Sequence, residues 1–170
     1  MKIPFSEITE RGLRKVVIDT GWSRRSGLDC RRAPRAEIVL RLTDEITAVL
    51  EGRMEAEVNM LCGRCGVPMD VEVDETFEYI FRLEEDKTLS HQEVELSEED
   101  IDTVFLDEPE IDIDEVLAEQ LILSVPVRPL CDEDCRGLCP RCGISRNEKQ
   151  CSCEVEQTHS PFAVLKQLKK

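Results

Sequence analysis

The chain has 170 residues, of which 41% are hydrophobic, and a net charge of −15. This length suits one domain with an appendage or two small domains, and no apolar run approaches the length of a membrane-spanning helix. The first seven residues lack the basic and apolar segments of a secretory signal, so we expect a cytoplasmic protein with no membrane partner.

The charge is spread unevenly along the chain. Residues 1–35 carry a net charge of +5, residues 36–69 of −3, residues 70–120 of −19 and residues 121–170 of +2. The middle would repel phosphate and attract a basic partner, so only the two ends are suited to meet RNA.

The first 35 residues give a short strand and two basic clusters. Val16, Val17 and Ile18 predict the strand, and the clusters surround Trp22 and Arg31. Basic residues beside an aromatic can bind RNA, but charge runs more often face water, and we expect a solvated loop here.

From residue 36 to residue 81, apolar and polar residues alternate. The apolar set is Ile38, Leu40, Leu42, Ile46, Ala48, Leu50, Met54, Ala56, Val58, Met60, Val71, Val73, Phe77, Tyr79 and Phe81. A period of two predicts an antiparallel β meander or partial barrel with one buried face and one wet face.

An acidic stretch and a helix follow. Residues 84–110 read as a linker or mobile loop, in which Val104–Leu106 could add a strand. Asp112 is a good helix N-cap, and Ile113, Val116, Leu117 and Leu121 form a stripe at helical spacing that ends near Ser124. The fold class is therefore α+β.

Six of the nine cysteines lie between Cys131 and Cys153. Disulfides fit poorly, because nothing indicates an oxidising compartment and the total is odd. A redox pair would belong in a thioredoxin-like βαβ context, whereas Cys139 and Cys142 sit among turn residues. Such paired turns are typical of structural zinc sites.

The ligand sets remain open at this level. Cys139 and Cys142 are the firm half of one site, and Cys151 and Cys153 close it most simply. A second zinc would use the other two pairs, which are Cys62, Cys65, Cys131 and Cys135. The alternative is one zinc per chain, with the upstream pair serving only as small residues beside a strand, and Cys30 is expected to be a plain thiol.

These segments give four regions. Residues 1–110 form the antiparallel β domain with its acidic loop, and residues 111–129 the helix with an extended connector. Residues 130–155 form the cysteine-rich zinc-binding module. Residues 156–170 form a C-terminal tail helix, with Ser160 as cap and Pro161 at its first position.

No arrangement of residues indicates catalysis. His91 and His159 lie in polar surroundings, and the carboxylates have no apolar setting that would raise a pKa. We therefore expect a non-enzymatic protein without a small-molecule substrate, in which zinc is structural and fully coordinated by the chain.

Three motifs together resemble the YceD family, also called DUF177. They are the run from Asp112 to Gly143, the upstream Cys62-Gly-Arg-Cys65, and the segment from Pro161 to Leu165. The resemblance implies a role in accumulation of the 23S rRNA and assembly of the large ribosomal subunit. Some members of the family lack the downstream cysteines but keep the upstream pair.

The resemblance and the charge map give the leading hypothesis and two alternatives. The first is an assembly factor whose acidic middle binds a basic large-subunit ribosomal protein, while its basic ends or zinc module contact 23S rRNA. The second is a zinc module that binds RNA directly, through Arg136 and Arg141. The third is an rRNA-processing or redox enzyme, which no cluster of catalytic residues supports.

Overall fold

The computed structural model describes residues 1–9, 11–19, 21–83 and 103–153. The chain divides into two compact units. The first, here the sheet unit, comprises Met1–Met60 and Pro68–Pro129. The second, here the cysteine unit, comprises Leu61–Val67 and Leu130–Lys170. Each is described separately.

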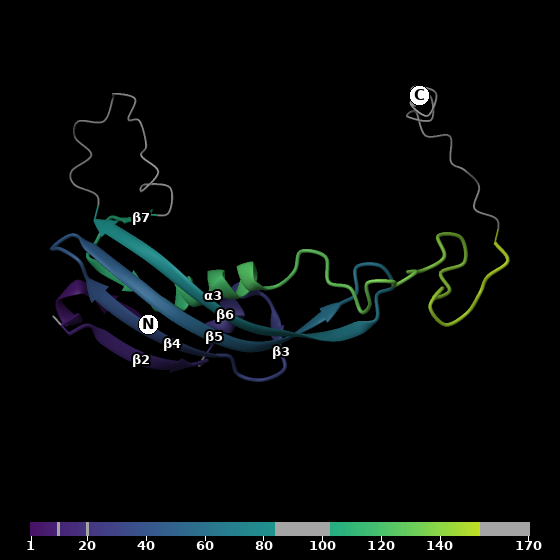
Figure 1. Ribbon diagram of the computed structural model, residues 1–170, viewed down its shortest axis with the longest axis horizontal. Coiled ribbons are helices and arrows are strands. Elements are labelled where there is room, and N and C mark those ends of the chain that lie inside the picture. Colours follow the sequence, from purple (N-terminus) through teal and green to yellow (C-terminus); the bar gives the residue numbers. More distant parts are fainter. Residues whose placement is uncertain (10, 20, 84–102, 154–170) are drawn as a thin grey trace, which may run out of the picture. The chain divides into compact units, whose positions relative to one another are not determined.

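The sheet unit is built on a mixed, mostly antiparallel sheet (Figure 1). Its order is β2 (Leu13–Ile18), β4 (Arg35–Leu42), β5 (Thr47–Leu61), β6 (Pro68–Leu83) and β7 (Thr103–Leu106), and the short β3 (Asp29–Cys30) also pairs with β5. The β2–β4 and β4–β5 pairs are antiparallel, as the alternating pattern predicts, whereas β7 runs parallel to β6.

The sheet buries the face that the period of two marks as apolar. Ile38, Leu40, Leu50, Met54 and Val58 have no exposed surface, whereas positions of the opposite parity carry charged residues such as Glu37, Arg41 and Arg53. Leu42 departs from the pattern, because it lies at the end of β4 and is 37% exposed.

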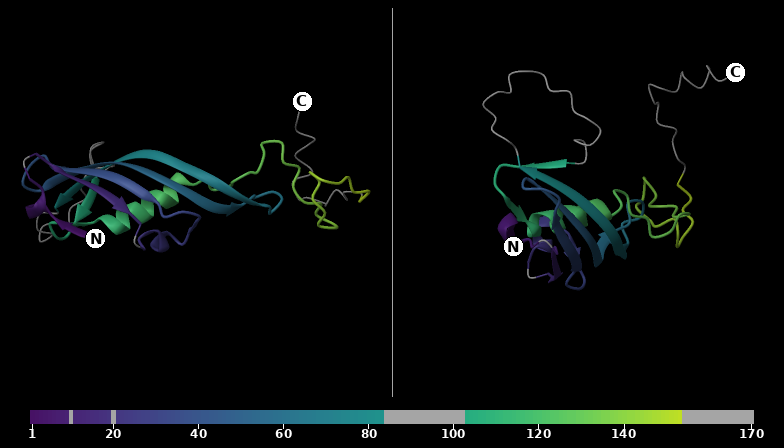
Figure 2. Two further views of the ribbon diagram at one scale, coloured as in Figure 1. Left: turned by 90° about the horizontal axis from the view of Figure 1, so that it is seen from below. Right: turned by 60° about the vertical axis from the view of Figure 1, so that its left-hand side comes forward.

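Helix α3 (Ile113–Ser124) covers the buried face (Figure 2). The four residues of the predicted stripe, Ile113, Val116, Leu117 and Leu121, are buried, and so is Ala118. The Asp112 side chain caps the helix by accepting from Asp114 N at 3.1 Å. A two-stranded antiparallel sheet of β1 (Lys2–Pro4) and β8 (Glu110–Asp112) leads into α3, with the 3-10 turn η1 (Phe5–Glu7) between β1 and β2.

The predicted basic loop around Trp22 is instead a one-turn helix, α1 (Ser23–Ser26). Asp19 fixes its start, because its carboxylate accepts from Gly21 N, Ser23 N and Ser23 Oγ. Trp22 is only 2% exposed and belongs to the core. Its ring is therefore not a surface on which an RNA base could stack.

The opposite face of the sheet is charged and laced with ion pairs. Arg53 contacts Asp74 through two nitrogens at 2.7 and 2.6 Å, and the Arg35–Glu37 and Arg41–Glu51 pairs lie beside it. The Arg53 hydrogen bonds hold the pKa of Asp74 below its usual value, outweighing partial desolvation. Asp74 therefore stays ionised at neutral pH.

Some predictions fall outside the described residues. They are most of the acidic stretch (residues 84–102), the tail helix (156–170), and the two histidines at 91 and 159. Within the described part of the chain, no helix is long and apolar enough to span a membrane.

Candidate functional site

The turn between β5 and β6 is a cysteine knuckle. In the sequence Cys62-Gly-Arg-Cys65-Gly66-Val67, the Gly66 N–H donates to Cys62 O at 2.8 Å, and the Cys62 N–H donates to Val67 O at 2.9 Å. Gly66 has φ of +71°, a conformation that favours glycine. The tight loop leaves both thiols and several N–H groups facing one point.

A second knuckle in the cysteine unit repeats this backbone. In Cys139-Pro-Arg-Cys142-Gly143-Ile144, Gly143 N donates to Cys139 O at 2.9 Å and Cys139 N to Ile144 O at 2.9 Å. Gly143 also has φ of +71°. The chain therefore contains two copies of one Cys-x-x-Cys-Gly-apolar turn, which differ in sequence but share both backbone hydrogen bonds.

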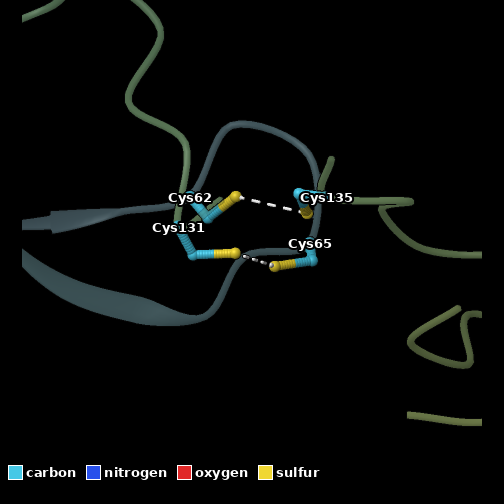
Figure 3. A group of neighbouring side chains, drawn as sticks. All are labelled: Cys62, Cys65, Cys131 and Cys135. Atoms are coloured by element: carbon cyan, nitrogen blue, oxygen red, sulfur yellow. Dashed lines mark hydrogen bonds between the residues drawn. The ribbon is translucent and has the colours of Figure 1, made fainter. Parts of the chain in front are cut away.

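The first knuckle faces the pair Cys131 and Cys135, which we call the first thiol group together with Cys62 and Cys65. All four sulfurs lie within 4.8 Å of one another. Figure 3 shows the side chains converging, with Sγ–Sγ distances of 3.8 Å from Cys62 to Cys135 and 3.6 Å from Cys65 to Cys131. Four sulfurs bound tetrahedrally at about 2.3 Å would lie about 3.8 Å apart, so the spacing fits a zinc-sized ion.

The second knuckle forms the second thiol group with Cys151 and Cys153. Its four sulfurs also lie within 4.8 Å of one another. The spacing pattern thus yields the two sets of four that the sequence hypothesis named. The ninth cysteine, Cys30, lies apart in β3 of the sheet unit, where burial raises the pKa of its thiol.

Hydrogen bonds and thiol–thiol contacts push the pKa values within the first group apart. Backbone N–H groups of Cys131, Cys65 and Arg64 lower the pKa of Cys62 to about 5. The pKa of Cys131 is raised to about 12, because its thiol donates to Cys65 and is partly desolvated. The hydrogen bonds thus favour the thiolate at Cys62 and the protonated thiol at Cys131.

The second group behaves in the same way. Backbone N–H groups of Cys142 and Arg141 lower the pKa of Cys139 to about 6, and the hydrogen bond to Cys142 raises the pKa of Cys153 to about 12. Four ionised thiolates at such spacing repel one another unless a cation lies among them. The donor set, all sulfur and arranged for four contacts, suits a thiophilic divalent ion such as zinc.

Arg64, inside the first knuckle, holds the cysteine unit together. Its Nη1 donates to the carbonyls of Glu133 and Cys135, both at 2.9 Å, and its own carbonyl accepts from Leu138 N at 3.2 Å. Gly137, with φ of +69°, passes so close that a Cβ would lie 2.9 Å from that carbonyl. Sequence reasoning treated Arg64 only as part of a motif.

Asn147 was missed entirely by sequence reasoning. Its Nδ2 donates to Cys135 Sγ at 3.2 Å, and its Oδ1 accepts from Arg136 N at 2.6 Å. The Asn147 hydrogen bond lowers the pKa of Cys135, outweighing desolvation. A single asparagine in a polar loop carries no signal in sequence spacing.

A family model and one named relative point to the same family. Residues 50–169 match the family model described as large ribosomal RNA subunit accumulation protein YceD. A chloroplastic protein of Arabidopsis thaliana, named large ribosomal RNA subunit accumulation protein YCED homolog 1, is 30% identical over 60 residues, which are 35% of this chain and 19% of that protein.

Uncharacterized proteins of Mycobacterium tuberculosis and Mycobacterium bovis are 31% identical over 133 residues, 78% of this chain and 56% of theirs. The chain thus spans about half the length of these mycobacterial relatives and a fifth of the plant protein. No solved structure matches it significantly. The family model covers most of the chain, from β5 through both thiol groups, so the chain belongs to the YceD family of large ribosomal RNA subunit accumulation proteins.

Proposed function

We propose that this chain supports accumulation of the large-subunit rRNA as a non-enzymatic assembly factor, in the compartment where large ribosomal subunits form. The observation that carries the proposal is the family match, which spans residues 50–169 and so includes both thiol groups. In each group four protein sulfurs would fill all four positions of a tetrahedral site. Such closed coordination is typical of structural zinc and leaves no position for a substrate.

Both thiol groups would hold zinc in this proposal. The first ion would be bound by Cys62, Cys65, Cys131 and Cys135, and the second by Cys139, Cys142, Cys151 and Cys153. Zinc neutralises the crowded thiolates and fixes the loops that carry them. In zinc-finger peptides such binding supplies folding free energy on the order of 10 kcal/mol.

The charged face of the sheet supports a basic protein partner. Arg35, Arg41 and Arg53 of this face are paired with carboxylates, whereas Glu72 and Glu78 of β6 form no ion pair with the described residues. The stretch 70–120, to which they belong, has a net charge of −19. A basic large-subunit ribosomal protein would complement this charge and associate quickly at low salt.

The test is a pull-down of tagged chain from cell lysate, with and without RNase. We expect large-subunit ribosomal proteins to be recovered in both samples and 23S rRNA only without RNase. A Glu72→Lys/Glu78→Lys variant should lose the ribosomal proteins, and an Arg11→Glu/Arg14→Glu variant should keep them. Recovery of neither ribosomal proteins nor rRNA would overturn the proposal.

Direct RNA binding by the cysteine unit is the second candidate, and exposed cations favour it. Arg136, Arg146 and Lys149 belong to the same unit as the second thiol group and are exposed. If they neutralise phosphates, the binding constant for 23S rRNA fragments should fall steeply with salt. Reversing two charges, in Arg146→Glu/Lys149→Glu, should weaken binding and flatten that dependence, whereas Arg11→Glu/Arg14→Glu should leave it steep.

A further inference from the structure

The two thiol groups of the cysteine unit are joined by a small hairpin. Leu138 and Ser145 form an antiparallel bridge, and Arg146 N donates to Gly137 O at 2.9 Å. The second knuckle, Cys139–Gly143, is the tip of this hairpin. One of its arms leads back to Cys135 of the first group, and the other leads on to Cys151 of the second.

Asn147, on this hairpin, contacts a sulfur of the first group. It lies on the arm between Cys142 and Cys151, so its position depends on the loop that the second group closes. Its Nδ2 reaches Cys135 Sγ at 3.2 Å, while its Oδ1 is anchored by Arg136 N at 2.6 Å. An N–H···S bond of this kind orients a ligand thiolate and disperses its charge.

Arg64 links the groups in the opposite direction, from the first knuckle to the segment that leads into the second. It is part of the first knuckle, yet its side chain holds the carbonyls of Glu133 and Cys135, and its carbonyl holds Leu138 N. Leu138 directly precedes Cys139, the first ligand of the second group. Closure of the first group therefore positions the arm from which the second knuckle begins.

We propose that the two thiol groups load zinc cooperatively, with Asn147 and Arg64 as the positioning residues that couple them. An ion in the second group fixes the loop that places Asn147 on Cys135, and an ion in the first group fixes the arm that leads into Cys139. Because coupling of this kind is reciprocal, each ion raises the affinity for the other. The inference rests on the proposal that both groups bind zinc.

The experiment measures zinc affinity of the reduced full chain by competition with a chelating dye. Three chains are compared: the unaltered chain, Cys151→Ser/Cys153→Ser, which keeps only the first group, and Cys62→Ser/Cys65→Ser, which keeps only the second. We expect the product of the two association constants of the unaltered chain to exceed the product of the single-group constants by about tenfold or more.

Asn147→Ala should remove most of that excess, because it deletes the donor to Cys135, and Gln150→Ala, in the same exposed loop, should preserve it. Cobalt substitution supplies an independent readout, since the thiolate-to-cobalt bands of the first group should shift in Asn147→Ala alone. Two ions per chain with a product that equals the single-group product would overturn the coupling and leave the zinc proposal standing. Uptake of fewer than two ions would overturn both.

Discussion

At the scale of single residues, two glycines of the cysteine unit differ in the space around them. Gly137 combines φ of +69° with a virtual Cβ 2.9 Å from Arg64 O, whereas Gly143, with φ of +71°, has open space around it. Both positions strain an alanine by roughly 1–2 kcal/mol, but only the first adds a collision with backbone.

We therefore expect Gly137→Ala to weaken zinc binding by the first thiol group by tenfold or more, because the Leu138 N–Arg64 O bond cannot form. Gly143→Ala, in the second knuckle, carries the same backbone strain without the collision. Its zinc affinity at the second thiol group should therefore fall by a factor several times smaller. Chelator competition on both variants checks this, and equal losses would show that strain alone matters.

Gly52 makes room for an aromatic ring in the sheet unit. A Cβ at this position of β5 would collide with Phe77 Cζ, so the ring of Phe77 covers the glycine backbone. Gly52→Ala should destabilise the chain by about 1–3 kcal/mol, as overpacking does, and Phe77→Leu should restore part of the loss in the double variant. Urea unfolding of the three variants measures the coupling, and additive losses would contradict it.

At the scale of elements, α3 depends on its N-cap residue, Asp112. Asp112 caps the helix through Asp114 N, and its Oδ2 accepts from Arg25 Nη1 at 3.0 Å. Asp112→Ala should cost about 1 kcal/mol of unfolding free energy, and Asp112→Asn less, since asparagine also caps. Urea unfolding at pH 7 ranks the two variants, and a greater loss in Asp112→Asn would contradict the capping role.

The same residue gives a pH dependence. Partial burial raises the pKa of Asp112, but the bond from Arg25 and nearby positive charge outweigh it, so the folded value lies below the usual 3.8. The stability that its charge contributes is therefore complete above about pH 4. It is lost as the pH falls through the folded value. The stability difference between the unaltered chain and Asp112→Asn should shrink from pH 7 to pH 3.

Sequence patterns predicted the elements whose signals lie within a single segment of the chain. The alternation through Ile38 and Met54 gave the sheet and its buried face, and the Asp112 cap with the Leu117 stripe gave α3, because each signal lies within one element. The parallel pairing of β7 and the burial of Trp22 arise from contacts between distant segments, for which the sequence carries no local signal.

The candidate site shows the same division. Cysteine spacing predicted the paired turns and offered the two groups of four as one of two hypotheses, which the sulfur positions in the structure favour. Two residues join the groups, Arg64 and Asn147. Arg64 contacts residues that are 69 and 71 positions away in the sequence, and Asn147 contacts a residue 12 positions away. Neither spacing nor composition could single them out.

At the scale of the whole molecule, the two units are stabilised by different means. The hydrophobic core cluster of the described residues lies entirely in the sheet unit, on the strands, α3, the N-terminal segment and Trp22, which directly precedes α1. In the described part of the cysteine unit, the buried apolar side chains are the thiols of Cys62, Cys135 and Cys139. The sheet unit is stabilised by its hydrophobic core. The interior of the cysteine unit consists of sulfur, so its folding free energy has to come from a bound metal ion.

Removal of metal should therefore unfold the cysteine unit and leave the sheet unit folded. With a strong chelator under reducing conditions, we expect amide hydrogen exchange to become fast throughout residues 61–67 and 130–153. Residues 36–58 should keep their protection, because Leu40, Leu50 and Met54 remain packed beneath α3. Protection should return on addition of zinc in proportion to the ions bound, up to two per chain. Protection of the cysteine unit that survives chelation would contradict a metal-dependent fold, and loss of protection in both units would contradict their independence.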